Sequence, residues 1–419
     1  MWNLLTVGDV PITYGDFQTP RFKKRAFWKS PRLSFWLRLF GNRSKTEAQN
    51  IPSFHSDTLY FSESVNSIRG VTMCHVCSMI CLFSAGLNIY CLGMNPRLIV
   101  FFKVALCLFT LPVLAQNKEG VEIIREEGQL RITIDGAPFS AYHFKNTPRP
   151  YLYPLLGPKQ LHMTRHWPMK DMPNEEHDHP HHRSLWFAFG SINGVDFWSE
   201  GSKAGKTIHE DFITVQSGKK VGVIKSSNQW VTLEGKKICS DVRTIRIYRT
   251  GTEERMLDFE ITLRASEGDL TFGDTKEGMM SLRLAETMRV KGKVAQGHIR
   301  NSEGVVDGAT WGKRAKWCDY YGPVDGHIVG AAMFDHPTNP RYPTWWHVRD
   351  YGLFAANPFG LHDFEGKPAG SGDLKVSAGE SITFSYRIIL HEGDTAEAKV
   401  AEKFEAFIKE KKSDPVGGR

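Results

Sequence analysis

The chain has 419 residues, of which 41% are apolar, 24% charged and 12% aromatic, a composition that excludes a disordered or collagen-like protein. It carries 53 Lys and Arg against 46 Asp and Glu. Residues 1–115 hold 12 of the basic and 5 of the acidic side chains, which leaves 41 of each in residues 116–419. The longer part therefore offers no net positive field to a phosphate backbone, so we predict no nucleic-acid partner.

Cysteine is divided in the same way, because five of the seven precede residue 116. Only Cys239 and Cys318 follow it, so one disulfide at most can form there and a disulfide framework is excluded. Cys74-His75-Val76-Cys77 has the spacing of a zinc half-site or a redox pair. Because no second pair stands at metal spacing, we interpret this motif as chance.

Residues 94–115 have the features of a signal peptide: a basic start, the apolar run 104–114 and small side chains up to Ala115. Lys103 interrupts the apolar stretch, and a membrane span needs about 20 uninterrupted apolar residues. We therefore predict a periplasmic or secreted protein, cleaved near Ala115, that meets the membrane only during export. Residues 1–93 are then an upstream extension, disordered or not natural.

Alternation of apolar and polar residues, which is typical of half-buried strands, dominates from residue 116 onward. The predicted strands cover 130–134, 185–189, 242–248, 257–263, 281–290, 328–334 and 382–390. Asp135-Gly136 accepts the positive φ of a tight hairpin. The one convincing helix lies near the end, with apolar residues at 398, 400, 404 and 408, where Asp394 or Thr395 can cap it. We predict one all-β domain over 116–412, a large antiparallel β-sandwich with one C-terminal helix, and a tail at 413–419.

The first segment that breaks the alternation is 149–198, which contains four histidines and three carboxylates within residues 175–182. Imidazoles can ligate a metal, transfer a proton near neutral pH or donate to sugar hydroxyls. Pro180 disfavours a helical conformation for His179, so the cluster belongs to a loop that leads into strand 185–189. The alternative is a surface loop whose histidines hydrogen-bond one another.

Two further segments combine aromatic and basic side chains. Residues 311–322 can form a sugar platform or a strand with a Trp-lined inner face. In segment 335–360, His347 and Arg349 are two residues apart, so in a strand their side chains point to the same side and can face one cleft. Trp345 and Trp346 belong to the core more readily than to a ligand site.

Two carboxylates stand out because of their positions. Glu286 lies on the apolar face of predicted strand 281–290, so it is either paired with an arginine, the commoner outcome, or a general acid or base with a raised pKa. Glu277 lies in loop 274–278, where proton transfer to a bound substrate is easier to arrange.

The sequence resembles the PmoA-like family of exported bacterial proteins over nearly all of 116–393. The resemblance rests on Arg149-Pro150-Tyr151, Thr164-Arg165, 178–187 with Asp196-Phe197-Trp198, Lys276-Glu277-Gly278, Trp311-Gly312 with 317–320, and 334–337 through 357–360. It implies a β-sandwich similar to the galactose-mutarotase type, in bacteria that degrade polysaccharides. The family's label, methane oxygenase, describes a multi-span membrane enzyme, but residues 116–393 contain no 18-residue apolar run, so we set that activity aside.

We predict that the protein acts on a carbohydrate by acid–base chemistry of the epimerase, lyase or hydrolase type. In this hypothesis His179, His182 and His347 transfer protons and Glu277 is the carboxylate partner. The expected substrate-binding residues are Arg165, Arg183, Trp186, Arg314, Asp319, His336, Arg349 and Asn357.

Two alternatives remain open. One is a non-catalytic glycan-binding protein of polysaccharide utilisation, in which aromatic rings supply most of the affinity. The other is a divalent metal held by His177, His179 and His181, although Pro180 disturbs the strand parity and no standard ligand spacing is met. Otherwise we predict no cofactor, and no protein partner is inferred.

Overall fold

The computed structural model describes residues 119–410, and most elements of this part are β-strands. The predicted extension 1–93, the Cys74-His75-Val76-Cys77 motif, the signal peptide and the tail lie outside the described residues. Among the helices of residues 119–410, none has the length and apolar character needed to cross a bilayer. Cys239 and Cys318 are both buried and free.

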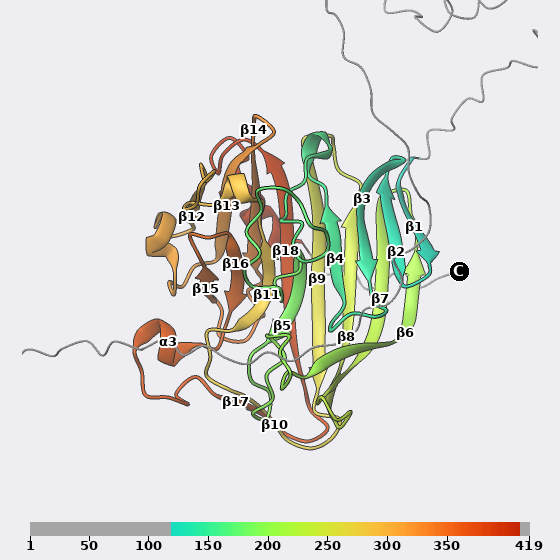
Figure 1. The fold of residues 1–419 in the computed structure, drawn as a ribbon, viewed down its shortest axis with the longest axis vertical. Coiled ribbons are helices and arrows are strands. Elements are labelled where there is room, and N and C mark those ends of the chain that lie inside the picture. The colour runs from blue at the N-terminus through green and yellow to red at the C-terminus, as the bar shows by residue number, and fades with distance from the viewer. Residues whose placement is uncertain (1–118, 411–419) are drawn as a thin grey trace, which may run out of the picture. The chain divides into compact units, whose positions relative to one another are not determined.

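Two antiparallel sheets of eight strands form a sandwich (Figure 1). The first sheet consists, in spatial order, of β1 (Val121–Glu126), β2 (Gln129–Ile134), β3 (Ala137–His143), β4 (Tyr151–Leu155), β5 (Leu185–Phe189), β11 (Gly278–Arg283), β16 (Leu353–Asn357) and β15 (Trp345–Val348). The second consists of β12 (His298–Asn301), β13 (Trp317–Val324), β14 (His327–Asp335), β18 (Ser381–Glu392), β9 (Glu254–Arg264), β8 (Lys237–Tyr248), β7 (Val221–Val231) and β6 (Lys206–Gln216). The predicted large antiparallel β-sandwich is confirmed.

The remaining elements are short. They are strands β10 (Leu270–Phe272) and β17 (Leu374–Val376), which pair with each other, helices α3 (Leu361–Glu365) and α4 (Val400–Phe407), and 3-10 turns at Pro158–Gln160, Glu286–Met288 and Asp307–Thr310. Helix α4 packs on the second sheet, where the rings of Phe404 and Phe334 have centroids 5.5 Å apart.

The main core lies between the two sheets, because the inward side chains of both are apolar. Phe187 of β5 lies 6.1 Å from Phe259 of β9 and 6.3 Å from Trp230 of β7, measured between ring centroids. The predicted hairpin is confirmed, since Asp135 and Gly136 have φ of 51° and 78° and join β2 to β3. The strand pattern identified part of this core, since Phe187 and Phe259 lie in predicted strands whereas Trp230 lies in β7, which was not predicted.

The predicted strand 281–290 is too long. β11 ends at Arg283, and the 3-10 turn Glu286–Met288 follows it, because the chain turns back through the hydrogen bond from the Met288 N–H to the Ala285 carbonyl. Glu286 forms an ion pair with Arg289, so the paired alternative is confirmed for this carboxylate.

The C-terminal helix is confirmed, but its predicted cap is wrong. Helix α4 begins only at Val400, without a side-chain cap. Asp394 Oδ1 instead accepts hydrogen bonds from the N–H groups of Ala396 and Glu397, at 2.8 and 2.9 Å, and so closes an earlier turn.

The tryptophans of the two aromatic segments are largely structural. Trp346 is fully buried and its indole N–H donates to the Ala315 carbonyl at 3.0 Å, which confirms its core position. Trp317 begins strand β13 and packs with helix α4. Residues 317–324 therefore form the strand with a buried Trp rather than an open platform.

Candidate functional site

The floor of the candidate site is the outer face of the first sheet, where β5, β11, β16 and β15 lie side by side (Figure 1). Because side chains alternate along a strand and Phe187 faces the core, Trp186 projects to the outer face. The register pairs Trp186 with Ser281, Ser281 with Ala355, and Ala355 with His347. His347 therefore lies on the same face as Trp186, three strands away.

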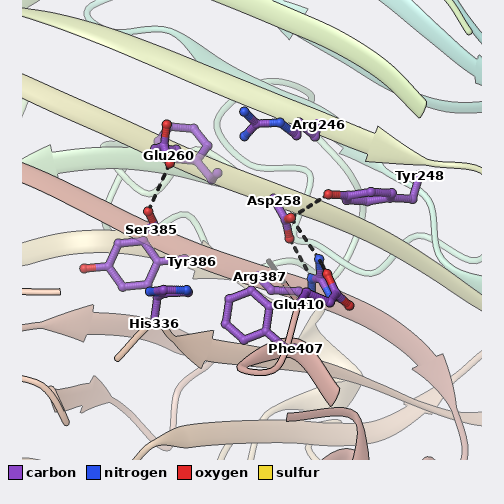
Figure 2. A pocket seen from close by; sticks show the side chains of 11 residues that line it. Arg246, Tyr248, Asp258, Glu260, His336, Ser385, Tyr386, Arg387, Phe407 and Glu410 are labelled. Carbon is purple, nitrogen blue, oxygen red and sulfur yellow. Dashed lines mark hydrogen bonds and ion pairs between the residues drawn. The ribbon is translucent and has the colours of Figure 1, made fainter. Parts of the chain in front are cut away.

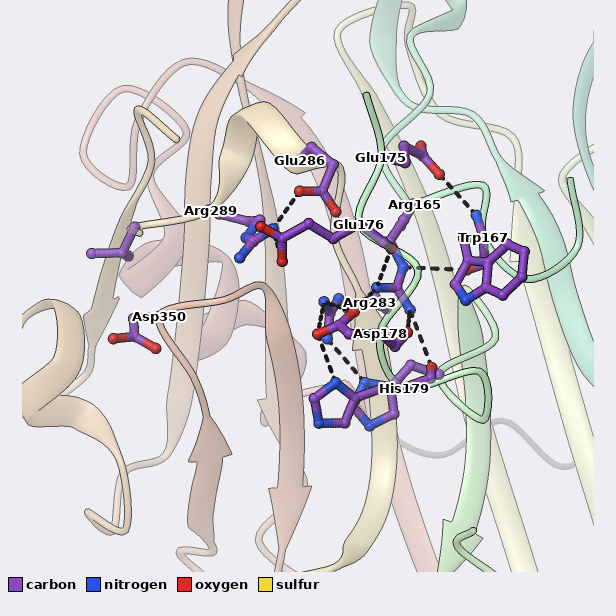
Figure 3. Close-up of polar contacts among 12 residues, drawn as sticks. Arg165, Trp167, Glu175, Glu176, Asp178, His179, Arg283, Glu286, Arg289 and Asp350 are labelled. Carbon is purple, nitrogen blue, oxygen red and sulfur yellow. Dashed lines mark hydrogen bonds and ion pairs between the residues drawn. The ribbon is translucent and has the colours of Figure 1, made fainter. Parts of the chain in front are cut away.

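The loop that carries the histidine cluster of residues 175–182, called the His-rich loop below, is attached to this floor through Asp178. Figure 3 shows its carboxylate between the guanidinium groups of Arg165 and Arg283. Arg283 Nη2 donates to both oxygens of Asp178, at 2.8 and 3.1 Å, and Arg165 Nη1 donates to Oδ1. Both arginines are completely buried, so this carboxylate neutralises charges that would otherwise be costly inside the protein.

His179 forms a dyad with the same carboxylate. Its Nδ1 lies 2.6 Å from Asp178 Oδ2, and a carboxylate can only accept, so Nδ1 carries a proton. In the neutral ring, Nε2 is then the basic atom. Burial opposes the negative charge of Asp178, but the hydrogen bond from His179 and the charges of Arg283 and Arg165 hold the pKa of Asp178 well below its usual value.

The backbone of His179 has φ of 42°, a left-handed conformation that non-glycine residues rarely adopt. Arg165 Nη2 stabilises it by donating to the carbonyl oxygens of Asp178 and His179, at 2.9 and 3.2 Å. The ring is held as well, stacked between His182 and Tyr351 at centroid distances of 4.7 and 5.2 Å. As predicted from Pro180, the segment is a loop, and it holds His179 in a fixed orientation.

The other histidines of the site are neutral near pH 7. Burial lowers the pKa of His182 well below its usual value, and Arg283 Nη1 donates to His182 Nδ1 at 3.1 Å, so the His182 proton is on Nε2. Burial also lowers the pKa of His181 to about 4 and that of His347 to about 3. Neutral imidazoles can donate and accept hydrogen bonds, which suits contacts with hydroxyl groups.

A cavity of about 490 Å³ opens between the His-rich loop and the sheet. It is lined by His179, His181, His182, Asp196, Trp198, Ser199, Lys276, Glu277, His347, Arg349 and Tyr351. The four predicted acid–base residues, His179, His182, Glu277 and His347, thus line one cavity, together with Arg349. His347 and Arg349, which are two residues apart, both line this one cavity, as predicted.

Glu277 is a carboxylate of this cavity whose pKa is shifted. Burial raises the pKa of Glu277 above its usual value, although Lys276 Nζ, 3.5 Å from Oε1, opposes the shift. The N–H of Gly190 donates to the Glu277 carbonyl at 2.7 Å. A Cβ on Gly190 would lie 2.8 Å from the Cβ of Glu277, so only glycine permits this close approach.

Four of the predicted substrate-binding residues are buried or, in the case of Arg183, half-buried around the cavity and do not line it. Arg165 anchors the loop, and Trp186 lies beneath His182 with ring centroids 5.2 Å apart. Arg183 donates twice to Glu200, at 2.8 and 2.7 Å. The side chain of Asn357 donates to the Thr275 carbonyl and accepts from the Phe359 N–H, which fixes the neighbouring loop. We place these residues in the support of the site.

Three other predicted binding residues lie outside the cavity. The Arg314 guanidinium covers Trp345 at 4.5 Å and donates to backbone carbonyls. Asp319 is completely buried. His336 lines a different cavity, of about 80 Å³, beside α4 (Figure 2), where Arg387 is neutralised by Asp258 and Glu410. The expected convergence of Arg314 with the histidines is therefore wrong, and the cations that line the cavity are Lys276 and Arg349.

The alternative metal site does not form in this structure. His177 stacks on Trp167, at 4.1 Å between ring centroids, and its Nε2 contacts Asp171. Within residues 119–410, no group of three or more His, Cys, Asp or Glu side chains is arranged to hold a metal ion. His177 thus contacts Trp167 and Asp171, whereas His179 and His181 contact each other.

Several residues of the site were not singled out from the sequence. Asp178 could have been found, because a carboxylate next to a histidine and near an arginine-bearing strand is a common way to orient an imidazole. Arg283 sits in a strand that otherwise reads as apolar, which signals a paired buried cation. Tyr351 and Lys276 carry no such signal, since only the fold brings them to the cavity.

Fold and site together define a β-sandwich protein with a histidine-rich pocket on the outer face of one sheet. The chain belongs to a family of unknown function, DUF6807, whose model matches residues 129–405. The match carries no PmoA label. Among curated proteins, no match is found.

Three solved structures show distant similarity. A putative kojibiose phosphorylase from the human microbiome is 9% identical with a TM-score of 0.27, over 50% of this chain and 25% of that one. A glycoside hydrolase family 97 enzyme from Pseudoalteromonas sp. strain K8, in complex with acarbose, is 10% identical with a TM-score of 0.25, over 64% and 33%. A GalM/aldose epimerase homologue from C. elegans is 8% identical with a TM-score of 0.26, over 65% and 99%. The chain thus spans a quarter to a third of the first two proteins, and TM-scores this low define neither a shared site nor a shared substrate.

Proposed function

We propose that the cavity binds a carbohydrate and that His179 acts on it as a general base, with Glu277 as its acid partner. The observation that carries this proposal is the Asp178–His179 dyad at a cavity that also contains Glu277. A base needs an unprotonated atom in reach of the substrate, and the dyad directs the His179 proton to Nδ1 and leaves Nε2 for that purpose. An acid must carry a proton to donate, and burial, which raises the pKa of Glu277, favours its protonated form.

The walls of the cavity support a sugar ligand. Trp198 and Tyr351 line it, and aromatic faces pack against the C–H groups of sugar rings. Neutral His181 and His347 can exchange hydrogen bonds with hydroxyl groups. The reaction types that this set can perform are epimerisation, elimination and hydrolysis, all of which move a proton between substrate and side chain.

His179→Ala and His179→Gln test the catalytic role. We expect each to lower the turnover of a responsive glycan about 10²–10⁴-fold and to remove the acidic limb of the pH–rate profile, since that limb reports protonation of the base. The assay is product release from a panel of plant and algal glycans, with binding measured in parallel. His177→Ala is the matched control, because His177 lies on Trp167 and outside the cavity.

The alternative of a non-catalytic glycan-binding protein predicts a different result. Trp198→Ala would then abolish binding, while the His179 variants would bind normally and no glycan would release product. Unchanged turnover in both His179 variants, with a glycan that is turned over, contradicts the acid–base proposal directly.

We further propose that the protein is exported and cleaved near Ala115, and that its likeness to PmoA-like proteins reflects a role in polysaccharide degradation. The support is the sequence of 94–115 and the residue pattern described above. Mass spectrometry of the protein from the periplasm or medium is expected to find a first peptide that begins close to Gln116. A first peptide from before Met94 contradicts the proposal.

A further inference from the structure

Arg349, a cation that lines the cavity, differs from the neighbouring arginines because it has no carboxylate partner. Arg349 follows strand β15, and its guanidinium carbon lies 5.5 Å from the ring centroid of Trp311 and 5.6 Å from that of Tyr351. These two rings hold the side chain where it lines the cavity. Its guanidinium forms no ion pair and no hydrogen bond with any residue of the described part.

Five other arginines around the His-rich loop form ion pairs: Arg149 and Arg183 with Glu200, Arg165 and Arg283 with Asp178, and Arg289 with Glu176 and Glu286. Each of these guanidinium groups thus contacts a carboxylate, whereas that of Arg349 contacts none in the part of the chain that the structure describes.

The carboxylates of the cavity itself are already engaged. Asp196 accepts hydrogen bonds from the N–H groups of Trp198 and Ser199, at 2.7 and 3.1 Å. Glu277 lies beside Lys276. Neither carboxylate forms an ion pair with Arg349, so its guanidinium is free to pair with an anionic group of a ligand.

We propose that the ligand of this cavity is an acidic sugar, a uronate, whose carboxylate binds Arg349. This inference rests on the proposed carbohydrate function and adds the substrate class. A guanidinium suits a carboxylate because its planar N–H groups match the two oxygens, and its contacts with ring faces restrict its motion in advance. Neutral sugars would leave the cation solvated and unused.

The test is calorimetric binding to the full chain. The probes are oligosaccharides of galacturonate, glucuronate and mannuronate, the methyl ester of each, neutral galactose oligomers and a sulfated galactose oligomer. We expect one uronate series to bind about tenfold or more tighter than its methyl ester, and its affinity to fall as salt is raised while that of the ester does not.

Arg349→Met should remove that preference, so that acid and ester bind equally. Arg300→Met is the matched control, because Arg300 is exposed on β12 of the other sheet. Thermal unfolding of each variant checks that the fold is retained. Lys in place of Arg349 should keep part of the preference, since it retains the charge and loses the planar geometry.

The outcomes separate this inference from the function on which it rests. Tight binding of neutral or sulfated oligomers only, or a uronate preference that survives in Arg349→Met, overturns the uronate assignment and leaves the carbohydrate function standing. Absence of binding to every glycan, charged or neutral, overturns both.

Discussion

Asp178→Ala is expected to lower the free energy of unfolding by about 3–5 kcal/mol, because it leaves two buried guanidinium groups without a counter-charge. Arg165 and Arg283 are both 0% exposed, and Asp178 is the carboxylate that both contact. The loss of this charge also frees the His-rich loop from the floor of the cavity. Activity should fall with stability, since His179 loses the group that orients it.

The measurement is denaturant unfolding, combined with limited proteolysis of the loop. Asp171→Ala is the control, because Asp171 lies in the same loop but is largely exposed, with a side-chain exposure of 74%, and contacts only His177. Its removal should change stability by less than about 1 kcal/mol. Equal effects of the two substitutions would show that Asp178 is not the anchor of the loop.

The strands could be predicted because their pattern is local. Residues 185–189 were assigned with the observed bounds, and the Asp135-Gly136 turn needs only two positive φ values. The error at 281–290 has a local cause as well. Leu284, Met288 and Val290 continue the alternation of the strand, so nothing in the alternation marks where the backbone turns.

The site could be predicted only where chemistry and position coincide. His179 stood out because histidines crowded in a loop are costly to position without a use, and Glu277 because a carboxylate on a loop can transfer a proton to a bound substrate; both line the cavity. Arg314 and Arg349 look equivalent in the sequence, because each is three residues from a Trp. The difference between them depends on β15, since Arg349 directly follows this strand and lines the cavity, while Arg314 covers Trp345 at the start of the strand.

Asp319 shows why a polar residue in an aromatic segment was misassigned. It accepts hydrogen bonds from His391 Nε2 at 3.0 Å and from the Thr395 hydroxyl at 2.6 Å, all within the protein. His391 reaches it across β14 because Gly330 has no side chain, and a Cβ there would lie 2.3 Å from the His391 ring. Contacts across an intervening strand cannot be read from periodicity.

Asp319→Ala is therefore expected to cost about 3 kcal/mol of stability and to leave ligand affinity unchanged, the reverse of what a binding residue would show. Burial alone would lower the pKa of His391, but the carboxylate of Asp319 prevails and raises it above the usual value. The pair thus contributes its full stability below the pKa of an unfolded histidine and loses it as pH rises through the folded-state pKa.

Urea unfolding between pH 5 and 9 measures this dependence, with His391→Gln as the variant in which this component of the pH dependence disappears. Gly330→Ala should reproduce the loss without a change in either charged group, because the added methyl group displaces the His391 ring. Reduced affinity for a glycan in a folded Asp319 variant would instead show that this carboxylate takes part in ligand binding, although its side chain is completely buried.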